Sequence, residues 1–172
     1  MDDQRTLLRH FLAALAYRTQ KALRDAPPDF GSFQPMADVR APARLVRHMT
    51  SVLGYARTFF IGGDYHPEPL PSLEAEVERF HAMLHDLARH LEAGDELRGT
   101  TPARLLQGPF SDAMTHAGQL ALLRRLAGSP VPPENFVVAE IDAANLTPLQ
   151  PAPASPDARW PEAPPGWRPA AG

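Results

Sequence analysis

The chain has 172 residues, of which 44% are hydrophobic and 22% are charged, and its formal net charge is −3. This composition is typical of one globular domain. Because no block of basic residues occurs, a nucleic-acid partner is not expected. The chain contains no cysteine, which excludes disulfides, thiolate metal sites and thiol nucleophiles. No apolar run approaches the roughly 18 residues of a membrane span, and no secretory signal pattern is seen, so a cytoplasmic location is expected.

Hydrophobic residues recur at helical spacing in four stretches of the chain. Proline and glycine residues separate these stretches, because neither continues a helix readily. The four helices are expected at about residues 3–24, 42–61, 72–93 and 101–127.

Specific residues indicate where these helices begin and end. Pro42 and Pro102 are suited to a first helical turn, and Thr101 stands in the capping position before the second of these prolines. Ser72 is a suitable N-cap for the third helix, which Gly94 closes. Such signals at the ends support the four assignments.

Four helices of this length favour an all-α fold, an antiparallel up-down four-helix bundle. We assign residues 1–146 to the bundle and residues 147–172 to a proline-rich C-terminal extension, which holds eight of the 20 prolines. The extension is either an extended tail or an arm packed on the bundle with Trp160 and Trp167 as anchors.

A histidine and a carboxylate share the apolar side of the fourth helix. His116 points toward that side, where an imidazole needs a polar partner, and Asp112 lies one turn earlier on nearly the same face. The pair is either a buried hydrogen bond or two ligands of a divalent metal. In an up-down bundle the second and fourth helices run parallel, so His48 could add a second imidazole. Two imidazoles and a carboxylate suit iron, zinc, nickel or manganese.

The third helix carries a rival pair of histidines, His81 and His85, spaced four residues apart. A regular leucine stripe already supplies the core face of this helix, so both histidines are expected on its solvated flank. His10 and His90 are interpreted in the same way, and His66 lies in a proline-rich loop.

Three passages resemble the DinB-like superfamily, the YfiT-type metal-binding four-helix bundles. They are Leu45–Met49 around His48, the run Asp112–Leu120, and Leu123–Pro130. The second passage is similar to the superfamily signature His-x-x-x-His-x-Gly-Gln. The likeness covers about residues 5–140 and implies a divalent metal, often nickel, zinc or iron, held by three histidines and open to substrate.

This chain departs from the superfamily's three-histidine pattern at one position. His48 and His116 match two of the superfamily's histidines, whereas Asp112 stands where the third is usual. A carboxylate adds negative charge and favours harder cations than an all-imidazole site does. The departure leaves two alternatives open, namely an altered metal site or a simple hydrogen bond between Asp112 and His116.

The resemblance implies a metal-dependent enzyme of the thiol-dependent S-transferase or hydrolase type. Its partner would be a small-molecule substrate or a low-molecular-weight thiol. Gln119, close after His116, could bind a ligand, and Tyr55, two turns beyond His48, could serve as a pocket donor. The alternative is a non-catalytic ligand-binding or stress-response bundle that acts by association without metal. The resemblance also implies assembly as a homodimer, which is common in the superfamily.

Overall fold

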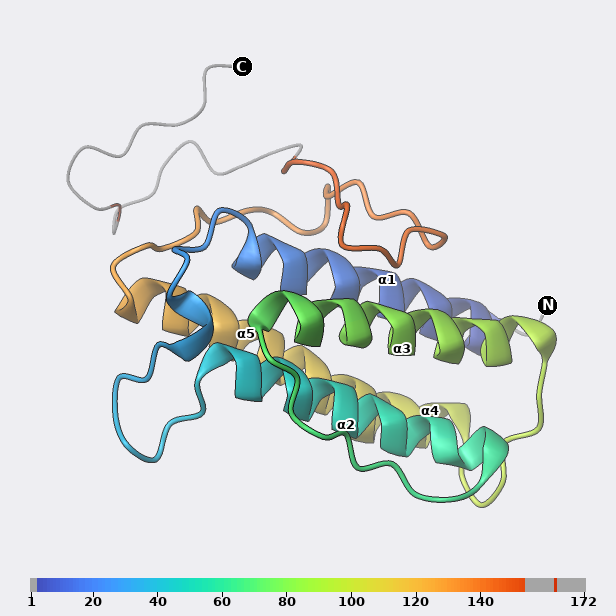
Figure 1. Cartoon of the computed structure of the whole chain (residues 1–172). Coiled ribbons are helices and arrows are strands. Elements are labelled where there is room, and N and C mark those ends of the chain that lie inside the picture. The colour runs from blue at the N-terminus through green and yellow to red at the C-terminus, as the bar shows by residue number, and fades with distance from the viewer. Residues whose placement is uncertain (1–2, 154–162, 164–172) are drawn as a thin grey trace.

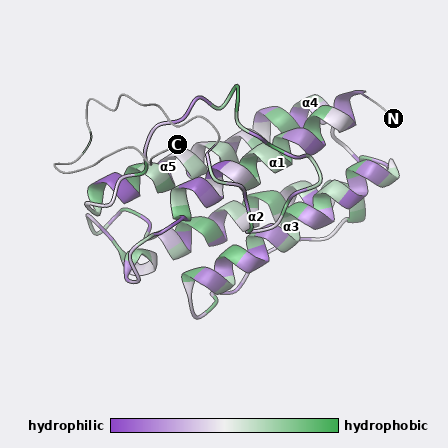
Figure 2. Ribbon diagram, turned by 90° about the horizontal axis from the view of Figure 1, so that it is seen from above, coloured by the Kyte–Doolittle hydropathy of each residue, from purple (hydrophilic) through white to green (hydrophobic). Residues whose placement is uncertain are grey.

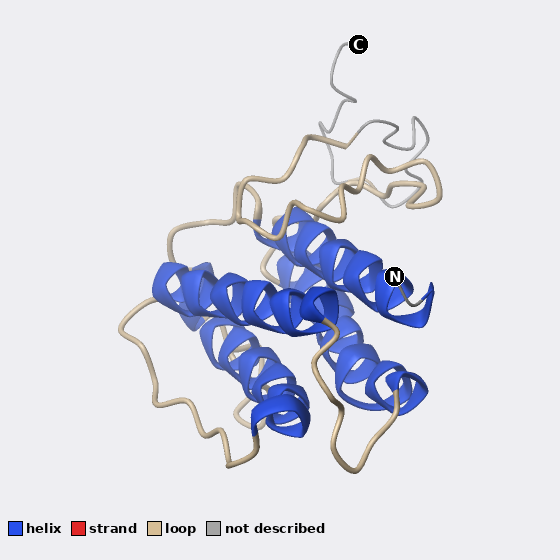
Figure 3. Cartoon of the chain, turned by 90° about the vertical axis from the view of Figure 1, so that its right-hand side faces the viewer, coloured by secondary structure: helices blue, strands red, loops and turns tan. Residues whose placement is uncertain are grey.

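The computed structural model describes residues 3–153 and 163, and these form helices and loops only (Figures 1 and 3). No strand occurs in this part of the chain, so the all-α class is confirmed. None of the helices described is long and apolar enough to cross a membrane. The main helices are α1 (Asp3–Leu23), α2 (Pro42–Ile61), α3 (Leu73–Ala93) and α5 (Ser111–Leu126), and the shorter elements are a 3-10 turn (Phe30–Ser32), α4 (Pro102–Leu105) and a π-helical turn (Leu106–Phe110).

The predicted helix ends are confirmed at the caps. The Ser72 hydroxyl accepts a hydrogen bond from the backbone N–H of Ala75 at 3.2 Å, and Thr101 does the same for Arg104 at 3.2 Å. Each cap satisfies a backbone donor that the first turn of a helix leaves unpaired. Gly94 ends α3 with a φ of 75°, a left-handed conformation that glycine adopts without steric cost.

The fourth predicted helix differs from expectation in its middle. Residues 101–127 do not form one continuous helix, because the backbone departs from helical geometry at Gly108 (φ −96°, ψ −106°). Pro109 lacks an N–H and disfavours helical angles in the residue before it, which explains the kink. The Ser111 hydroxyl donates to the carbonyl of Leu106 at 2.6 Å and so satisfies an acceptor at the break.

The helix directions contradict the expected up-down order. The C-terminal ends of α2 and α3 lie together: the rings of Phe60 and His90 stack at 5.1 Å, and the Arg98 N–H donates to the Phe59 carbonyl at 2.8 Å. These two helices therefore run parallel. Helices α1 and α5 also run in one direction, opposite to α2 and α3 (Figure 1). Arg124, near the C-terminal end of α5, accordingly donates to the carbonyl of Ala22, near the C-terminal end of α1.

The connection between α2 and α3 explains this topology. Residues 62–72 form 11 residues of non-helical chain, and an extended chain of that length spans up to about 36 Å. A 20-residue helix is about 30 Å long. The segment therefore runs back along the bundle, so that α3 starts at the same end as α2 (Figure 1). An up-down order requires each connection to turn back directly into an antiparallel neighbour, which residues 62–72 do not do, and the predicted up-down order is wrong for that reason.

Every long helix contributes to one hydrophobic core. Hydrophobic and hydrophilic residues share each helix (Figure 2), as expected for helices that bury one face. Leu12, Met49, Leu84 and Leu120, one from each long helix, are fully buried in this core. Burial of such side chains stabilises the fold by about 1.5–3 kcal/mol each.

The chain after α5 packs along α1 without forming a helix (Figure 1). Glu134 is buried there, and its carboxylate accepts hydrogen bonds from the Lys21 ammonium at 2.9 Å and the Tyr17 hydroxyl at 2.6 Å. Arg24 donates to the carbonyl of Gln150 at 2.9 Å, beyond the boundary drawn at residue 147. The positions predicted for Trp160 and Trp167 lie outside the described residues.

Candidate metal centre

The three side chains singled out on the sequence come together between α2 and α5. His48, Asp112 and His116 each offer one ligand atom, and these atoms lie within 4.8 Å of one another. The two imidazole rings are 4.7 Å apart between centroids and inclined by 72°. In the part of the chain that the structure describes, this is the one group of three or more such side chains at metal-binding spacing.

His48 and His116 lie at the same level of the bundle, but the helix directions that bring them together differ from the predicted ones. His48 lies near the beginning of α2, and His116 lies well along the unit formed by α4 and α5. Because α2 and α5 run antiparallel, an early position on one faces a late position on the other. The expectation that they run parallel was wrong, yet the convergence of the two imidazoles holds.

The group is buried on one side and open on the other. His116 is 8% exposed and His48 is half-buried, whereas the Asp112 side chain is 51% exposed. A cation bound here would have protein ligands on the core side and free positions toward solvent. Three protein ligands with an open position is the arrangement of catalytic rather than structural zinc sites.

The hydrogen bonds of His116 define which ring nitrogen is free. Its Nδ1 lies 2.7 Å from the Oε1 atom of Gln119, and an amide oxygen can only accept, so Nδ1 donates. The Nε2 atom then faces the Asp112 Oδ1 atom at 3.3 Å. If the ring is neutral, Nε2 carries a lone pair, and that lone pair would repel the Asp112 carboxylate. A positive charge between the two atoms, either a proton or a metal ion, removes that conflict.

His48 is held in the protonation state that metal ligation requires. Burial lowers its pKa below the ordinary value for histidine, and the charges of Arg40 and His116 lower it further, against an opposing effect of Asp112. A neutral imidazole keeps a lone pair on one nitrogen, which is the form that binds a metal ion.

The donor set fits a first-row divalent cation. Ligand atoms at about 2.0–2.2 Å from a metal lie roughly 3–3.5 Å from one another. The ligand atoms here lie within 4.8 Å of one another, so binding requires closure by up to roughly 1–2 Å. The ring of His116 is already fixed by Gln119, as metal-bound imidazoles usually are by a partner on the other nitrogen. His48, Asp112 and His116 could therefore hold such an ion.

The two accessory residues of the prediction have different surroundings. Gln119 contacts His116, so it supports a candidate ligand rather than standing free for a substrate. Tyr55 is 57% exposed, and its ring packs on Phe59 at 5.0 Å between centroids. It is not one of the residues that gather around His48.

The histidines of α3 differ from expectation in two of three cases. His85 is exposed, as predicted, but His81 and His90 are buried and not solvated. The His81 ring uses both nitrogens, one against the Leu146 carbonyl at 2.6 Å and one against the Gln20 amide at 2.8 Å. Neither nitrogen is left for a metal, so His81 and His85 do not form a rival site.

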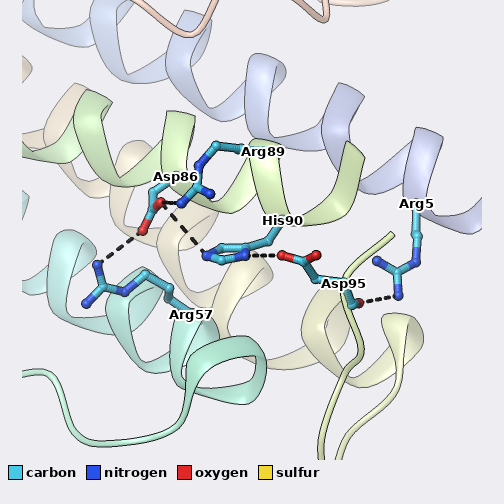
Figure 4. Close-up of polar contacts among 6 residues, drawn as sticks. All are labelled: Arg5, Arg57, Asp86, Arg89, His90 and Asp95. Atoms are coloured by element: carbon cyan, nitrogen blue, oxygen red, sulfur yellow. Dashed lines mark hydrogen bonds and ion pairs between the residues drawn. The ribbon is translucent and has the colours of Figure 1, made fainter. Parts of the chain in front are cut away.

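His90 belongs to a network that ties α3 to its neighbours (Figure 4). Its Nδ1 contacts Asp95 at 2.6 Å, and its Nε2 lies 3.8 Å from the Asp86 carboxylate. Burial opposes ionisation of Asp86, but hydrogen bonds from Arg89 and Arg57 outweigh that effect and lower its pKa. We refer to His90, Asp86 and Asp95 with these two arginines as the α3 network.

Sequence reasoning missed the residues that flank the candidate metal centre. Three arginines, Arg40, Arg44 and Arg47, line a hollow that also includes His48. The spacing of Arg44, Arg47, His48 and Ser51 places these four residues on one face of α2 and was the available signal. These arginines do not follow one another in the sequence, so they form no basic block that the composition of the chain would reveal.

Comparison with protein-family models, with curated proteins and with solved structures finds no significant match to this chain.

Proposed function

We propose that this chain is a DinB-like protein that binds a divalent metal through His48, Asp112 and His116 and uses it in catalysis. The reaction would be of the thiol-dependent S-transferase or hydrolase type, acting on a small molecule or a low-molecular-weight thiol. A cytoplasmic location and assembly as a homodimer belong to the same proposal. The convergence of three ligand atoms within 4.8 Å is the observation that supports it most strongly.

A bound divalent cation would supply a Lewis acid that lowers the pKa of a coordinated water or thiol. The chain's own residues have simpler roles. Gln119 fixes the His116 ring through Nδ1, which directs Nε2 toward Asp112. Asp112 brings negative charge to the site and, by its exposure, keeps one side of the site accessible. The carboxylate favours a harder cation than three imidazoles would, so it raises the suitability of manganese relative to nickel and zinc.

A non-catalytic role is the second candidate. The contact of 3.3 Å between His116 Nε2 and Asp112 Oδ1 is also that of an ion pair with a protonated imidazole. Such a pair needs no metal, and the bundle would then bind a small ligand or a partner protein without turnover, as a stress-response module could.

Equilibrium metal binding tests the proposal. The protein is prepared without a histidine tag, stripped with a chelator and dialysed against zinc, manganese, iron(II) and nickel in turn. Bound metal is measured by elemental analysis. We expect close to one metal per chain in the wild type, and a strong loss in His48→Ala and in His116→Ala.

His85→Ala is the matched control, since it removes an exposed histidine on α3 that lies outside the group. It should leave the metal content unchanged. A wild type that takes up none of the four metals, or a His48→Ala variant that binds as well as the wild type, would sink the metal site and favour the second candidate.

Turnover separates the enzyme from the binder. The metal-loaded protein is incubated with a low-molecular-weight thiol and an electrophile, and in a second assay with an activated ester. Product formation that requires added metal and is lost in His116→Ala supports an enzyme. Metal binding without turnover in either assay favours a binding module.

A further inference from the structure

A polar hollow of about 270 Å³ lies directly beside the candidate metal centre. His48 is a member of both the hollow and the metal-binding group. A molecule in the hollow would therefore contact the edge of the centre. The remaining lining residues are Arg40, Arg44, Arg47, Ser51, His66, Pro67 and Glu68.

The three arginines of this hollow outnumber the carboxylates beside them, which are Glu68 in the same lining and Asp38, which lines a second hollow together with Arg40 and Arg44. The ion pairs that arginine and lysine make among the described residues use other side chains, and none involves Arg40, Arg44 or Arg47. Three guanidinium groups face one carboxylate, that of Glu68, in the lining. His48 belongs to the same lining, so the charges of these arginines lie close to the candidate metal centre.

Such an arrangement is unfavourable in the free protein, because Arg44 and Arg47 lie on one face of α2, where like charges repel one another, and Arg40 lines the same hollow. An anion in the hollow would relieve the repulsion. Guanidinium groups bind carboxylate and phosphate oxygens in a forked geometry and are the side chains that most often recognise these groups in proteins. The chemistry of the hollow is therefore that of an oxyanion site.

A second, larger groove of about 920 Å³ adjoins the same arginines. It shares Arg40 and Arg44 with the polar hollow, and it includes Gln119, the partner of His116. The polar hollow therefore adjoins the candidate metal centre through His48 and the larger groove adjoins it through Gln119, and two arginines are common to both.

The lining of this groove is mainly apolar. Met36, Leu122 and Leu126 all line it, and all three are exposed large hydrophobic side chains. Contiguous exposed apolar surface commonly marks a binding site. A ligand that filled the groove would remove these side chains from water.

We infer that the substrate of the metal centre is a small amphipathic oxyanion. Its carboxylate or phosphate group contacts Arg40, Arg44 and Arg47, and its apolar part lies in the groove along α5. The inference rests on the proposed function, since it names the substrate class of that site, but the arginine contacts themselves do not require a metal.

Isothermal titration of the metal-free protein tests the inference. The probes are octanoate and octyl phosphate, with butyrate and inorganic phosphate as short counterparts. Because each buried methylene strengthens binding, we expect the octyl probes to bind at least about tenfold more tightly than the short ones. The stronger of the two octyl probes identifies the preferred oxyanion.

A triple variant, Arg40→Gln with Arg44→Gln and Arg47→Gln, should weaken binding of both octyl probes by about tenfold or more. Arg104→Gln is the matched control, because Arg104 is an exposed arginine outside both hollows, and it should bind like the wild type. A thermal melt of each variant shows that the fold is intact. Binding that is equal in the triple variant, or that does not depend on chain length, overturns the inference.

The effect of the anion on metal affinity tests whether the anion binds beside the candidate metal centre. Saturating octanoate should raise the apparent affinity for zinc severalfold, since the anion offsets the arginine charges near His48. An unchanged zinc affinity overturns the placement beside the centre. If no metal binds but octanoate binding still depends on the arginines, the proposed metal function fails while the oxyanion site stands.

Discussion

Two clusters of histidine and carboxylate side chains lie in this bundle, and their surroundings differ. In the α3 network the His90 ring has a carboxylate at each nitrogen, and Arg57 and Arg89 contact one of those carboxylates (Figure 4). In the group between α2 and α5, two imidazoles face one carboxylate. No ion pair of an arginine or lysine among the described residues involves Asp112.

The difference indicates what separates a structural cluster from a candidate metal centre. In the α3 network two arginines contact the Asp86 carboxylate, and both nitrogens of His90 face carboxylates, so neither His90 nor Asp86 offers an added cation a donor atom without a partner. The group of His48, Asp112 and His116 has donor atoms without such a balance. The arginines near it line the hollow that includes His48, where they are suited to an anion. The following experiments test this distinction.

The largest expected effect concerns a third buried histidine, His81, whose ring nitrogens are both occupied. Burial is the main cause that lowers its pKa, the hydrogen bond to the Leu146 carbonyl opposes the shift, and the charge of His85 adds a smaller lowering effect. Together these effects bring the pKa from 6.5 to about 4. The unfolded chain therefore binds a proton more readily than the folded chain between these values. The stabilising contribution is complete above pH 6.5 and is lost as the pH falls toward 4.

Urea unfolding at pH 7 and at pH 4 measures this loss. The free energy of unfolding of the wild type should fall by about 3 kcal/mol more than that of His81→Gln, which cannot titrate. If the two proteins lose stability in parallel, His81 is not held neutral by its structural contacts.

The second effect contrasts the two clusters directly. His116→Ala should lower metal affinity by at least about 100-fold, because loss of a ligand exceeds the 10- to 100-fold effect of outer partners. His90→Ala should leave metal affinity unchanged. Competition with a chromogenic chelator measures both, and a metal affinity that falls equally in the two variants would contradict the contrast.

The third effect concerns the stability that the α3 network provides. Asp86→Ala removes an acceptor shared by Arg57 and Arg89 and should lower the free energy of unfolding by about 2 kcal/mol. Chemical unfolding at neutral pH measures the change. Metal binding at His48, Asp112 and His116 should not respond, and a loss of metal in this variant would show that the two clusters are coupled.

The smallest effect concerns Gln119. Gln119→Ala leaves Nδ1 of His116 without its acceptor and should lower metal affinity by about tenfold, with little change in stability because Gln119 is exposed. Gln119→Glu keeps an acceptor at this position and should restore most of the affinity. If both variants bind metal like the wild type, the hydrogen bond does not orient the ring.

Local features of the fold were predictable from the sequence. The caps at Ser72 and Thr101 follow from side-chain chemistry within one helical turn, and the spacing of Asp112 and His116 follows from helix geometry. These relations depend on neighbouring residues only, so no tertiary information was needed. The convergence of His48 on this pair was predicted as well, although through a wrong assumption about helix direction.

Features that depend on tertiary packing were not predictable. The direction of α3 depends on whether residues 62–72 turn back sharply or run along the bundle, and the sequence allows both. Burial of His81 depends on the chain around Leu146, which no helical pattern of α3 reveals. The arginine hollow likewise depends on where Arg40 lies relative to α2, since it precedes the helix.

The topology also affects how this chain must fold. The four principal packed pairs are α1 with α3, α1 with α5, α2 with α3 and α2 with α5. The first two helices of the chain, α1 and α2, are not one of these pairs. The partners in one hydrogen bond between α1 and α5 are separated by 102 residues. The relative contact order of this chain therefore exceeds that of an up-down bundle of equal size. We expect this chain to fold more slowly than such a bundle for that reason. During synthesis on the ribosome, α1 gains its last helical neighbour only after α5 has emerged from the exit tunnel.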